Sequence, residues 1–436
     1  MLTNNGNNNY IFNIDKFYKN YLKGPEIFKR RDALDPSYVP EELPHRDTEI
    51  QKVAELTACA LKDDCPPNFL CYGQTGTGKT ATIRYISQKL AQQSLINKPW
   101  WIYTNCSVVS TPYRILAHIY NTISGSEKIP PTGLPKDVIF KKLLGLMDQK
   151  IGPSICFIVL DEVDMVAEKK GGNEILYDLT ELTKNLDYCK VCLIGISNKL
   201  KFKEKLDPRV ISRIGKEHIV FPIYDASQLR DILYKRAKVA FQEGVLKTDV
   251  IPLCAKLAYE EHGDARKALQ LLKKAGSIAE STQKEQVSKN HVHKAQDELE
   301  KDHIVEYIQG MPLQAQLTLT AIYLIAKFEH NHVITSGDVY EVHSELCYKI
   351  PRVKQLTKRR ISDYINELVL AGIITADTRS MGHYGRTKII QLDIEKGLLG
   401  RVLRNISKIG NLLNDKPILL QTNKVKLKNN VFKRLL

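Results

Sequence analysis

The sequence predicts an α/β fold in which a mostly parallel sheet is covered by helices on both faces, followed by helical regions and a hairpin. Short apolar runs alternate with segments of helical spacing between residues 69 and 221, which is typical of right-handed strand–helix–strand units. The run 155–160 is apolar at every position, as expected for a strand buried on both sides. After Pro222 the strand patterns stop and helical spacing takes over.

Element boundaries follow from hydrophobic spacing and capping residues. Five strands are predicted, at residues 69–72, 100–103, 155–160, 191–196 and 218–221. The predicted helices span 47–61, 81–92, 112–124, 287–309 and 313–328, and two more begin near Thr335 and Thr357. The region 226–286 is predicted to be helical, with breaks near 244–249 and 261–264.

The composition favours a soluble protein with a polyanionic partner. The hydrophobic content of 43% is enough for packed cores, and no apolar run approaches a membrane span. The net charge of +15 favours a polyanion, although evenly spread charge would only aid solubility. Of nine cysteines, Cys189 and Cys192 form the one C-x-x-C pair, and no second pair completes a zinc site. The polar start has no signal-peptide pattern, so we expect a cytoplasmic protein with reduced thiols.

Residues 73–80 have the sequence GQTGTGKT, between a predicted strand and a predicted helix. In this context the glycines allow successive backbone N–H groups to surround an anion at a helix start. Lys79 would reach the β- and γ-phosphates, and the Thr80 hydroxyl would bind Mg²⁺. The sequence therefore predicts ATP or ADP bound with Mg²⁺ by Gly73, Gly76, Thr77, Gly78, Lys79, Thr80 and Ala81.

Acidic residues follow the strongest predicted strand. Asp161 stands at its carboxyl end, where a carboxylate beside the phosphate loop can hold the Mg²⁺ shell. Glu162 is predicted to orient or deprotonate the attacking water. The DExD pattern at 161–164 also begins a helicase signature, but no second mononucleotide-binding half follows it.

Three further residues complete a predicted ATPase site. Asn198 ends a neighbouring strand, where an amide can fix the attacking water. Arg213, in a predicted loop near the last strand, can act on the γ-phosphate of a neighbouring subunit, and such arginine fingers raise rates by about 10³–10⁵. Arg266 begins a helix of the small helical region, from which it can clamp the γ-phosphate.

The order of these motifs resembles that of the AAA+ ATPases. The details look like the archaeal origin-recognition and replication-initiator family, relatives of the eukaryotic origin recognition complex and its helicase-loading partner. The resemblance covers about residues 26–395 and is carried by the stretches 38–46, 105–106, 195–198 and 262–269. It implies an AAA+ P-loop ATPase core at 26–225, a helical lid at 226–300 and a winged-helix DNA-binding domain at 301–395. Composition, and not the resemblance, predicts a flexible tail at 1–25 and a basic tail at 396–436.

The resemblance also implies that adenine contacts the segment 38–46, Tyr224 and Arg236. From the residues alone, Tyr224 and Arg236 would be interpreted as lid packing and a solvated charge. The resemblance does not decide between Arg209 and Arg213 as the finger, and we favour Arg213.

Two residues depart from the family pattern. Lys199 stands where the family usually has an acid, and Ile223 stands where it often has a proline. Neither position is expected to touch the phosphates, so the departures bear on the local turn.

A cationic cluster leads into the third helix of the C-terminal region, with six Lys and Arg residues and no acid between 349 and 360. The helix has an apolar stripe of Ile361, Ile365 and Leu368, and its opposite, polar face suits a major groove. The following hairpin can lie along a phosphate backbone or enter a minor groove. The predicted DNA contacts here are Lys358, Arg359, Ser362, Asn366, Arg379, Tyr384 and Arg386. The alternative is a helical domain used for protein contacts.

A second DNA contact is implied by the resemblance at the insert 127–136, which includes Lys128. From the residues alone, the Pro-Pro-Thr-Gly stretch predicts only a turn. The basic tail from Arg401 is predicted either to add nonspecific phosphate contacts or to be disordered.

Together these features predict an ATP-dependent initiator that binds duplex origin DNA and helps recruit or load the replicative helicase, with other initiator paralogues as possible neighbours at the nucleoid. Nucleotide would act mainly as a switch, with weak ATPase activity, because the finger comes from another subunit. The main alternative is a nucleotide-gated transcription regulator with little hydrolysis. A helicase or clamp-loader subunit is a third option that leaves the winged helix unexplained.

Overall fold

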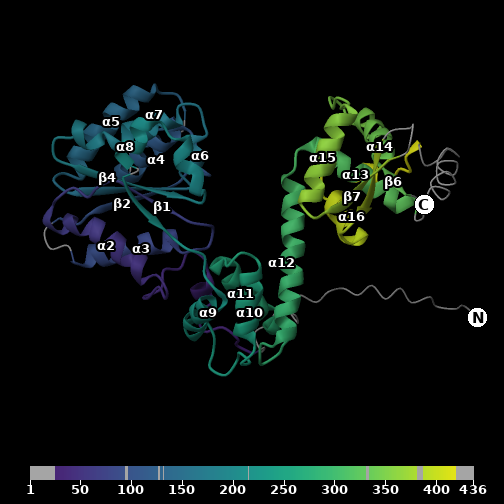
Figure 1. Ribbon diagram of the computed structural model, residues 1–436, viewed down its shortest axis with the longest axis horizontal. Coiled ribbons are helices and arrows are strands. Elements are labelled where there is room, and N and C mark those ends of the chain that lie inside the picture. Colours follow the sequence, from purple (N-terminus) through teal and green to yellow (C-terminus); the bar gives the residue numbers. More distant parts are fainter. Residues whose placement is uncertain are drawn as a thin grey trace, which may run out of the picture. The chain divides into compact units, whose positions relative to one another are not determined.

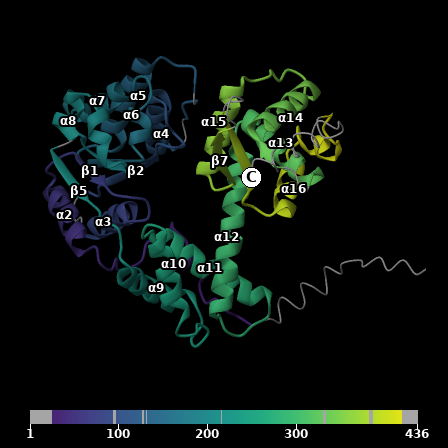
Figure 2. The ribbon, with the colours of Figure 1, turned by 45° about the vertical axis from the view of Figure 1, so that its right-hand side comes forward.

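The computed structural model describes residues 25–93, 97–125, 128–130, 132–214, 216–329, 333–380 and 386–418. The chain divides into two compact units, residues 1–296 and 297–436, each with its own sheet. Helix α12 (Lys289–Gly310) runs from the first unit into the second (Figure 1, Figure 2). No helix in the described part of the chain is long and apolar enough to cross a membrane.

The first unit is built on a five-stranded sheet with the strand order β2-β3-β4-β1-β5. Every neighbouring pair of strands is parallel, as predicted. The strands are β1 (Phe69–Tyr72), β2 (Trp100–Asn105), β3 (Ile155–Asp161), β4 (Lys190–Ser197) and β5 (Glu217–Val220). Each begins and ends within two residues of its predicted bounds.

Helices cover both faces of this sheet. Helices α2 (Asp47–Thr57) and α3 (Lys79–Gln93) lie on one face, and α4 (Pro112–Ser124), α5 (Lys136–Lys150) and α7 (Gly172–Thr180) lie on the other (Figure 1). Alternate β3 residues belong to the two cores, with Phe157 in one and Ile158 in the other. That alternation explains why this strand is apolar throughout.

Short elements connect the layers of the first unit. They are η1 (Arg31–Leu34), η2 (Ala58–Lys62), α6 (Asp164–Ala167), η3 (Leu182–Asn185), η4 (Leu200–Lys205) and α8 (Pro208–Ile214). The loop predicted around Arg213 is therefore wrong, because Pro208 supplies a favourable first helical residue and Val210 and Ile214 bury one face of a short helix.

Three helices after the sheet form the lid, α9 (Ala226–Ala240), α10 (Val250–Glu260) and α11 (Ala265–Ser281). Asp225 begins α9 with a capping box in which its side chain accepts from the Gln228 N–H and the Gln228 side chain accepts from the Asp225 N–H. The segment before η1 packs against the lid, where the Phe28 and Phe241 rings lie 4.8 Å apart. Gly276 leaves room for them, since a Cβ atom there would lie 2.5 Å from Phe28.

The second unit is a winged helix around a three-stranded antiparallel sheet with the order β6-β8-β7. Its elements are α13 (Leu313–Phe328), β6 (Ile334–Thr335), α14 (Ser336–Lys349), α15 (Lys358–Leu370), β7 (Ile374–Ser380), β8 (Arg386–Leu392), α16 (Lys396–Arg404) and η6 (Gly410–Asn414). Thr335 and Thr357 cap α14 and α15 through their side chains, as their positions predict.

The predicted basic tail at 396–436 is wrong at its start. Helix α16 buries Leu399, Val402 and Leu403 in the core of the second unit. The amphipathic spacing of these residues outweighs the basic composition, because burial of apolar surface stabilises a helix more than dispersed surface charge affects it. The predicted lid boundary at residue 300 also falls inside α12. The predicted tails at 1–24 and from 419 onward lie outside the described residues.

We predict that Thr335→Ala lowers the free energy of unfolding of the full chain by about 1 kcal/mol. The buried Thr335 hydroxyl accepts the Asp338 N–H at 3.2 Å and donates to the Asp338 carboxylate at 2.7 Å, so its loss leaves buried polar groups unpaired. Urea denaturation followed through the winged helix measures the change. Thr335→Ser is the control, because it retains the hydroxyl. An equal loss in both variants would assign the effect to the methyl group.

Candidate nucleotide-binding site

A cavity of about 560 Å³ lies in the first unit between the phosphate loop, the carboxyl ends of β3 and β4, and the lid. Segment 36–44 closes one side, and α9 and α11 supply residues from the lid. Most of the predicted nucleotide residues line it, namely Gly76, Gly78, Lys79, Thr80, Ala81, Asp161, Glu162, Asn198, Tyr224, Arg236 and Arg266. The fold thus brings together residues almost two hundred positions apart in sequence.

Two positions of the phosphate loop require glycine, because of their backbone conformation and because neighbouring residues leave no room for a side chain. Gly76 and Gly78 have φ angles of 75° and 90°, a conformation that residues with side chains rarely adopt. A Cβ atom at Gly78 would lie 2.8 Å from the Tyr224 hydroxyl, and one at Gly76 would overlap the Asp264 carboxylate. The loop and the lid therefore meet with no space for a larger residue.

Lys79 begins α3 with its residue only 6% exposed. Its Nζ donates to the backbone carbonyls of Gly73 at 2.8 Å and Gln74 at 2.7 Å. Burial lowers the pKa of Lys79 to about 8, and the nearby Asp161 carboxylate opposes that shift. A phosphate would give this ammonium group a charged acceptor in place of neutral carbonyls, so the residue fits a nucleoside phosphate.

The two predicted Mg²⁺ ligands meet at the edge of the cavity. The Thr80 hydroxyl donates to Asp161 Oδ2 at 2.7 Å, and the Glu162 N–H donates to Asp161 Oδ1 at 3.0 Å. A pair of protein oxygens suits Mg²⁺, which takes its remaining ligands from water and phosphate. Glu162 has a φ of 55°, and such strain at a residue with a side chain is typical of functional positions.

Asn198 follows β4, which lies between β3 and β1 in the sheet, and its side chain lines the cavity with Glu162. The turn here is fixed by Ser197, whose hydroxyl donates to Asp164 at 2.9 Å and accepts from the Lys199 N–H at 3.0 Å. Lys199 pairs with Asp164 at 3.3 Å and Glu168 at 2.8 Å. The lysine that departs from the family pattern at position 199 is thus paired with two acidic side chains.

Helix α11 begins beside the phosphate loop. Asp264 caps it by accepting from the Arg266 N–H at 2.7 Å, and the Ala265 N–H donates to the Gly76 carbonyl at 3.3 Å. A helix N-terminus carries positive potential, and the Arg266 side chain lines the same cavity. The lid therefore presents positive charge where phosphates would lie.

Arg46 lies buried, 2% exposed, between the phosphate loop and the lid linker. Its guanidinium donates to the carbonyls of Thr77 at 2.8 Å, His45 at 3.0 Å and Pro222 at 2.6 Å. It also lies 3.7 Å from the centre of the Tyr224 ring. Sequence reasoning gave Arg46 no role of its own, and its position between Leu43-Pro44-His45 and the first helix was the only signal.

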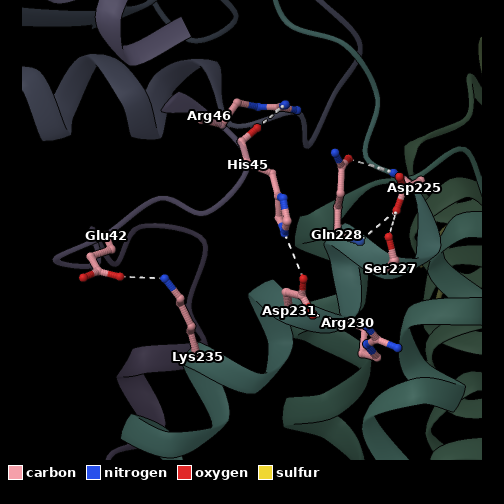
Figure 3. A network of polar contacts seen from close by, with 9 residues as sticks. All are labelled: Glu42, His45, Arg46, Asp225, Ser227, Gln228, Arg230, Asp231 and Lys235. Atoms are coloured by element: carbon pink, nitrogen blue, oxygen red, sulfur yellow. Dashed lines mark hydrogen bonds and ion pairs between the residues drawn. The ribbon is translucent and has the colours of Figure 1, made fainter. Parts of the chain in front are cut away.

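The segment 38–46 is held to α9 by polar side-chain contacts. Glu42 pairs with Lys235 at 2.6 Å and His45 pairs with Asp231 at 3.1 Å (Figure 3). Arg236 lies 4.7 Å from the centre of the Tyr38 ring and donates to the Tyr38 carbonyl at 3.2 Å. Arg236 is not the solvated charge that the residues alone predict, because it is 8% exposed.

The Arg236 side chain also tests whether a nucleotide fits this cavity. Its Nη1 atom is buried with no hydrogen-bond partner among the described residues. A buried donor without a partner is costly, and a ligand acceptor in the cavity would satisfy it. On this side the cavity is lined by apolar and aromatic residues and by one donor, Arg236 Nη1, that has no partner among the described residues. Such a lining fits a heteroaromatic base.

Arg209 and Arg213, the two candidate fingers, do not line the cavity of their own chain. Arg213 pairs with Glu181, and Arg209 pairs with Asp207 at 2.9 Å. Both guanidinium groups lie over the Tyr177 ring, that of Arg209 at 5.4 Å and that of Arg213 at 5.2 Å from its centre. These contacts hold both side chains on α8.

The winged helix presents the predicted polar face of α15. Ile361, Ile365 and Leu368 are buried as predicted, while Arg359 and Asn366 are exposed. Lys358 and Arg360 lie against the rings of Tyr340 and Tyr364. Lys388, which the sequence analysis did not assign, donates to Ser362 at 3.0 Å and Asn366 at 2.6 Å. Arg379 is exposed on β7, Tyr384 lies outside the described residues, and Arg386 begins β8.

The insert is anchored to α4 next to the exposed Lys128. Asn121 accepts from the Ile129 N–H at 2.7 Å and donates to the Ile129 carbonyl at 2.9 Å. The Tyr113 hydroxyl donates to the Pro130 carbonyl at 3.1 Å. Ile129 is buried in the larger core of the first unit. The backbone next to Lys128 is thus fixed to α4 by hydrogen bonds and by the burial of Ile129.

Three family models match the chain. They are an AAA ATPase domain at residues 42–131, a Cdc6 AAA+ ATPase-type lid domain at 230–297 and a CDC6 C-terminal winged helix domain at 306–400. With the geometry above, these matches define an AAA+ ATPase with a helical lid and a C-terminal winged helix.

Relatives narrow the class to a family. An ORC1-type DNA replication protein of Pyrococcus furiosus is 46% identical over 92% of this chain and 95% of its own length, and ORC1-type DNA replication protein 1 of Methanosarcina acetivorans is 42% identical over 87% and 91%. The solved structure of the Aeropyrum pernix ORC1 protein in complex with DNA has a TM-score of 0.77 and 39% identity, covering 88% of this chain and 99% of that one. The chain belongs to the archaeal Orc1/Cdc6 family of AAA+ ATPases, which confirms the predicted resemblance.

We predict that binding of Mg²⁺–ATP takes up protons near pH 8.5. With a pKa of about 8 in the ligand-free chain, Lys79 is then mostly neutral, and phosphate would restore its charge, with an uptake of roughly 0.7 proton. Calorimetry in buffers of different ionisation enthalpy measures the uptake. Lys79→Arg is the control, because arginine stays charged throughout this range. Equal uptake by both chains would contradict the assignment.

Proposed function

We propose that this chain is a DNA replication initiator that binds ATP and duplex origin DNA and helps recruit or load the replicative helicase. Relatives named as ORC1-type DNA replication proteins support it at 42–46% identity, and one relative has been solved in complex with DNA. The observation that carries the proposal is one chain with both a phosphate-loop cavity and a winged helix whose recognition helix has a polar, cation-rich outer side.

In the first unit, the residues around the cavity bind and orient the nucleotide. The phosphate-loop N–H groups and Lys79 would hold the phosphates, Thr80 and Asp161 would hold the Mg²⁺ ion, and the base would lie toward Tyr224 and Arg236. Bound Mg²⁺ would neutralise charge on the phosphates. Glu162 orients or deprotonates the attacking water together with Asn198, and Arg266 holds the terminal phosphate from the lid.

The arginine finger is supplied by a neighbouring molecule, and Arg213 is the residue we assign to it. Its pairing with Glu181 holds it on α8 at 32% side-chain exposure, available to a second protein. Hydrolysis by the isolated chain is therefore slow, and ATP and ADP act as a switch.

DNA contact is assigned to two surfaces. The winged helix contributes Lys358, Arg359, Ser362, Asn366 and Arg379 together with the hairpin residues Tyr384 and Arg386, and the insert on the ATPase core contributes Lys128. Cations on both surfaces would make the affinity strongly salt-dependent. The proposed domains are an ATPase core at 26–225, a lid at 226–300 and a winged helix from 301. Helix α16 packs into the core of the winged helix.

A nucleotide-gated transcription regulator is the alternative that shares this scaffold. A genome-wide occupancy map at the nucleoid, with pull-down of the replicative helicase and of initiator paralogues, tests the choice. Occupancy of origin repeats with helicase recovery supports initiation. Binding confined to isolated promoters, with no helicase recovered, would overturn it.

We predict that Glu162→Gln lowers the ATP hydrolysis rate at least about a hundredfold while ATP affinity stays within about threefold, because the substitution removes a base and leaves the phosphate contacts. Single-turnover hydrolysis and equilibrium binding measure the two quantities. Glu168→Gln is the control, since this carboxylate pairs with Lys199 and Lys205 outside the cavity. Unchanged hydrolysis in Glu162→Gln would exclude this residue as the base.

We predict that Arg359→Ala weakens duplex DNA binding by about 1–3 kcal/mol if its exposed guanidinium contacts a base, and less if it contacts phosphate. Fluorescence anisotropy at several salt concentrations separates the two cases. Arg230→Ala, on α9, is the charge-matched control. If Arg359→Ala binds as the control does, at every salt concentration, α15 is not the recognition helix.

A further inference from the structure

A lysine from the hairpin covers the polar face of the recognition helix. Lys388 lies on β8, two residues before the buried Ile390, so both side chains leave the strand on the same face. That face is packed against the helices of the second unit. The Lys388 stem therefore follows the edge of the core, and its Nζ reaches the hydroxyl of Ser362 and the amide of Asn366 on successive turns of α15.

This contact fixes the orientation of the Asn366 amide. An ammonium group donates and never accepts, so the atom that Asn366 turns toward Lys388 at 2.6 Å is Oδ1. The Nδ2 donors then point away from Lys388. The exposed Asn366 and the remaining Lys388 donor together offer N–H groups to a ligand, while the amide oxygen is engaged within the protein.

The pattern of donors decides which base edge fits. An asparagine that reads adenine must accept from N6 and donate to N7 with the same amide. In the major groove, guanine presents two acceptors, O6 and N7, and needs only donors. Oδ1 retains a second lone pair, but the Lys388 ammonium beside it would repel the N6 amino group of adenine and attract the O6 acceptor of guanine. A face with donors from Lys388 and Asn366 therefore matches guanine better than adenine.

We propose that Lys388 and Asn366 form a paired donor site that selects guanine in the major groove. The inference rests on the proposed DNA-binding function of α15 and names the base that this surface reads. Lys388 contacts the base edge directly and also positions the Asn366 amide. Lys358 and Arg359, at the start of α15, would contact the phosphate backbone.

Selection of bound duplexes from a randomised library by the full-length chain tests the proposal. The wild-type chain is expected to enrich guanine at one position, by about tenfold over adenine. In Lys388→Met the amide is free to turn, so the preference at that position shifts toward adenine. Replacing the selected guanine by 7-deazaguanine, which lacks the N7 acceptor, should weaken wild-type binding about tenfold and leave Lys388→Met binding nearly unchanged.

Lys358→Met is the matched control, because it removes the same charge from the predicted phosphate contacts and should weaken binding to all sequences alike. Thermal unfolding of each variant checks that the winged helix is intact. If Lys388→Met loses affinity uniformly, as the control does, Lys388 contacts phosphate and the proposal fails while DNA binding stands. If the wild-type chain binds no duplex in the library, the proposed function itself fails.

Discussion

One buried cation joins the parts of the first unit on which its nucleotide site depends. The Arg46 guanidinium is bonded at once to the phosphate loop at Thr77, to the lid linker at Pro222 and to its own segment at His45. Burying a charge is expensive unless hydrogen bonds surround it. Three carbonyls and the face of Tyr224 supply those contacts, so the loop, the linker and the 38–46 segment hold a common geometry.

The position of the lid relative to the phosphate loop depends on contacts in the same region. The Tyr224 ring lies against the Arg46 guanidinium and its hydroxyl lies close to Gly78, and the Ala265 N–H at the start of α11 donates to the Gly76 carbonyl. Each contact reaches the phosphate loop through backbone atoms or glycine. Any shift of the phosphate loop would therefore disturb these contacts with the lid.

Much of the geometry of the candidate site could be predicted because its motifs are local in sequence. The phosphate loop carries its own strand, glycines and helix, and Asp161 and Asn198 stand directly at strand ends that a parallel sheet aligns. The capping residues Thr335 and Thr357 could be predicted for the same reason. In each case a short pattern contains the whole physical reason for the structure.

Contacts between distant segments could not be predicted in the same way. Arg46 gains its role from Pro222 and Tyr224, far along the chain, and the pairing of Lys388 with Asn366 depends on how a strand crosses a helix. Arg236 is buried because Tyr38 covers it. Helix α16 was missed for another reason, because the prediction for this segment rested on its basic composition and not on the apolar spacing of Leu399, Val402 and Leu403.

The most direct measurement of the central claim is a crystal structure of the full chain with Mg²⁺ and a non-hydrolysable ATP analogue. We expect the phosphates to lie against Lys79 and the N–H groups of residues 76–80, the metal at Thr80 and Asp161, and the base between segment 38–44 and Arg236. A nucleotide bound elsewhere, with Lys79 still bonded to the Gly73 and Gln74 carbonyls, would contradict it.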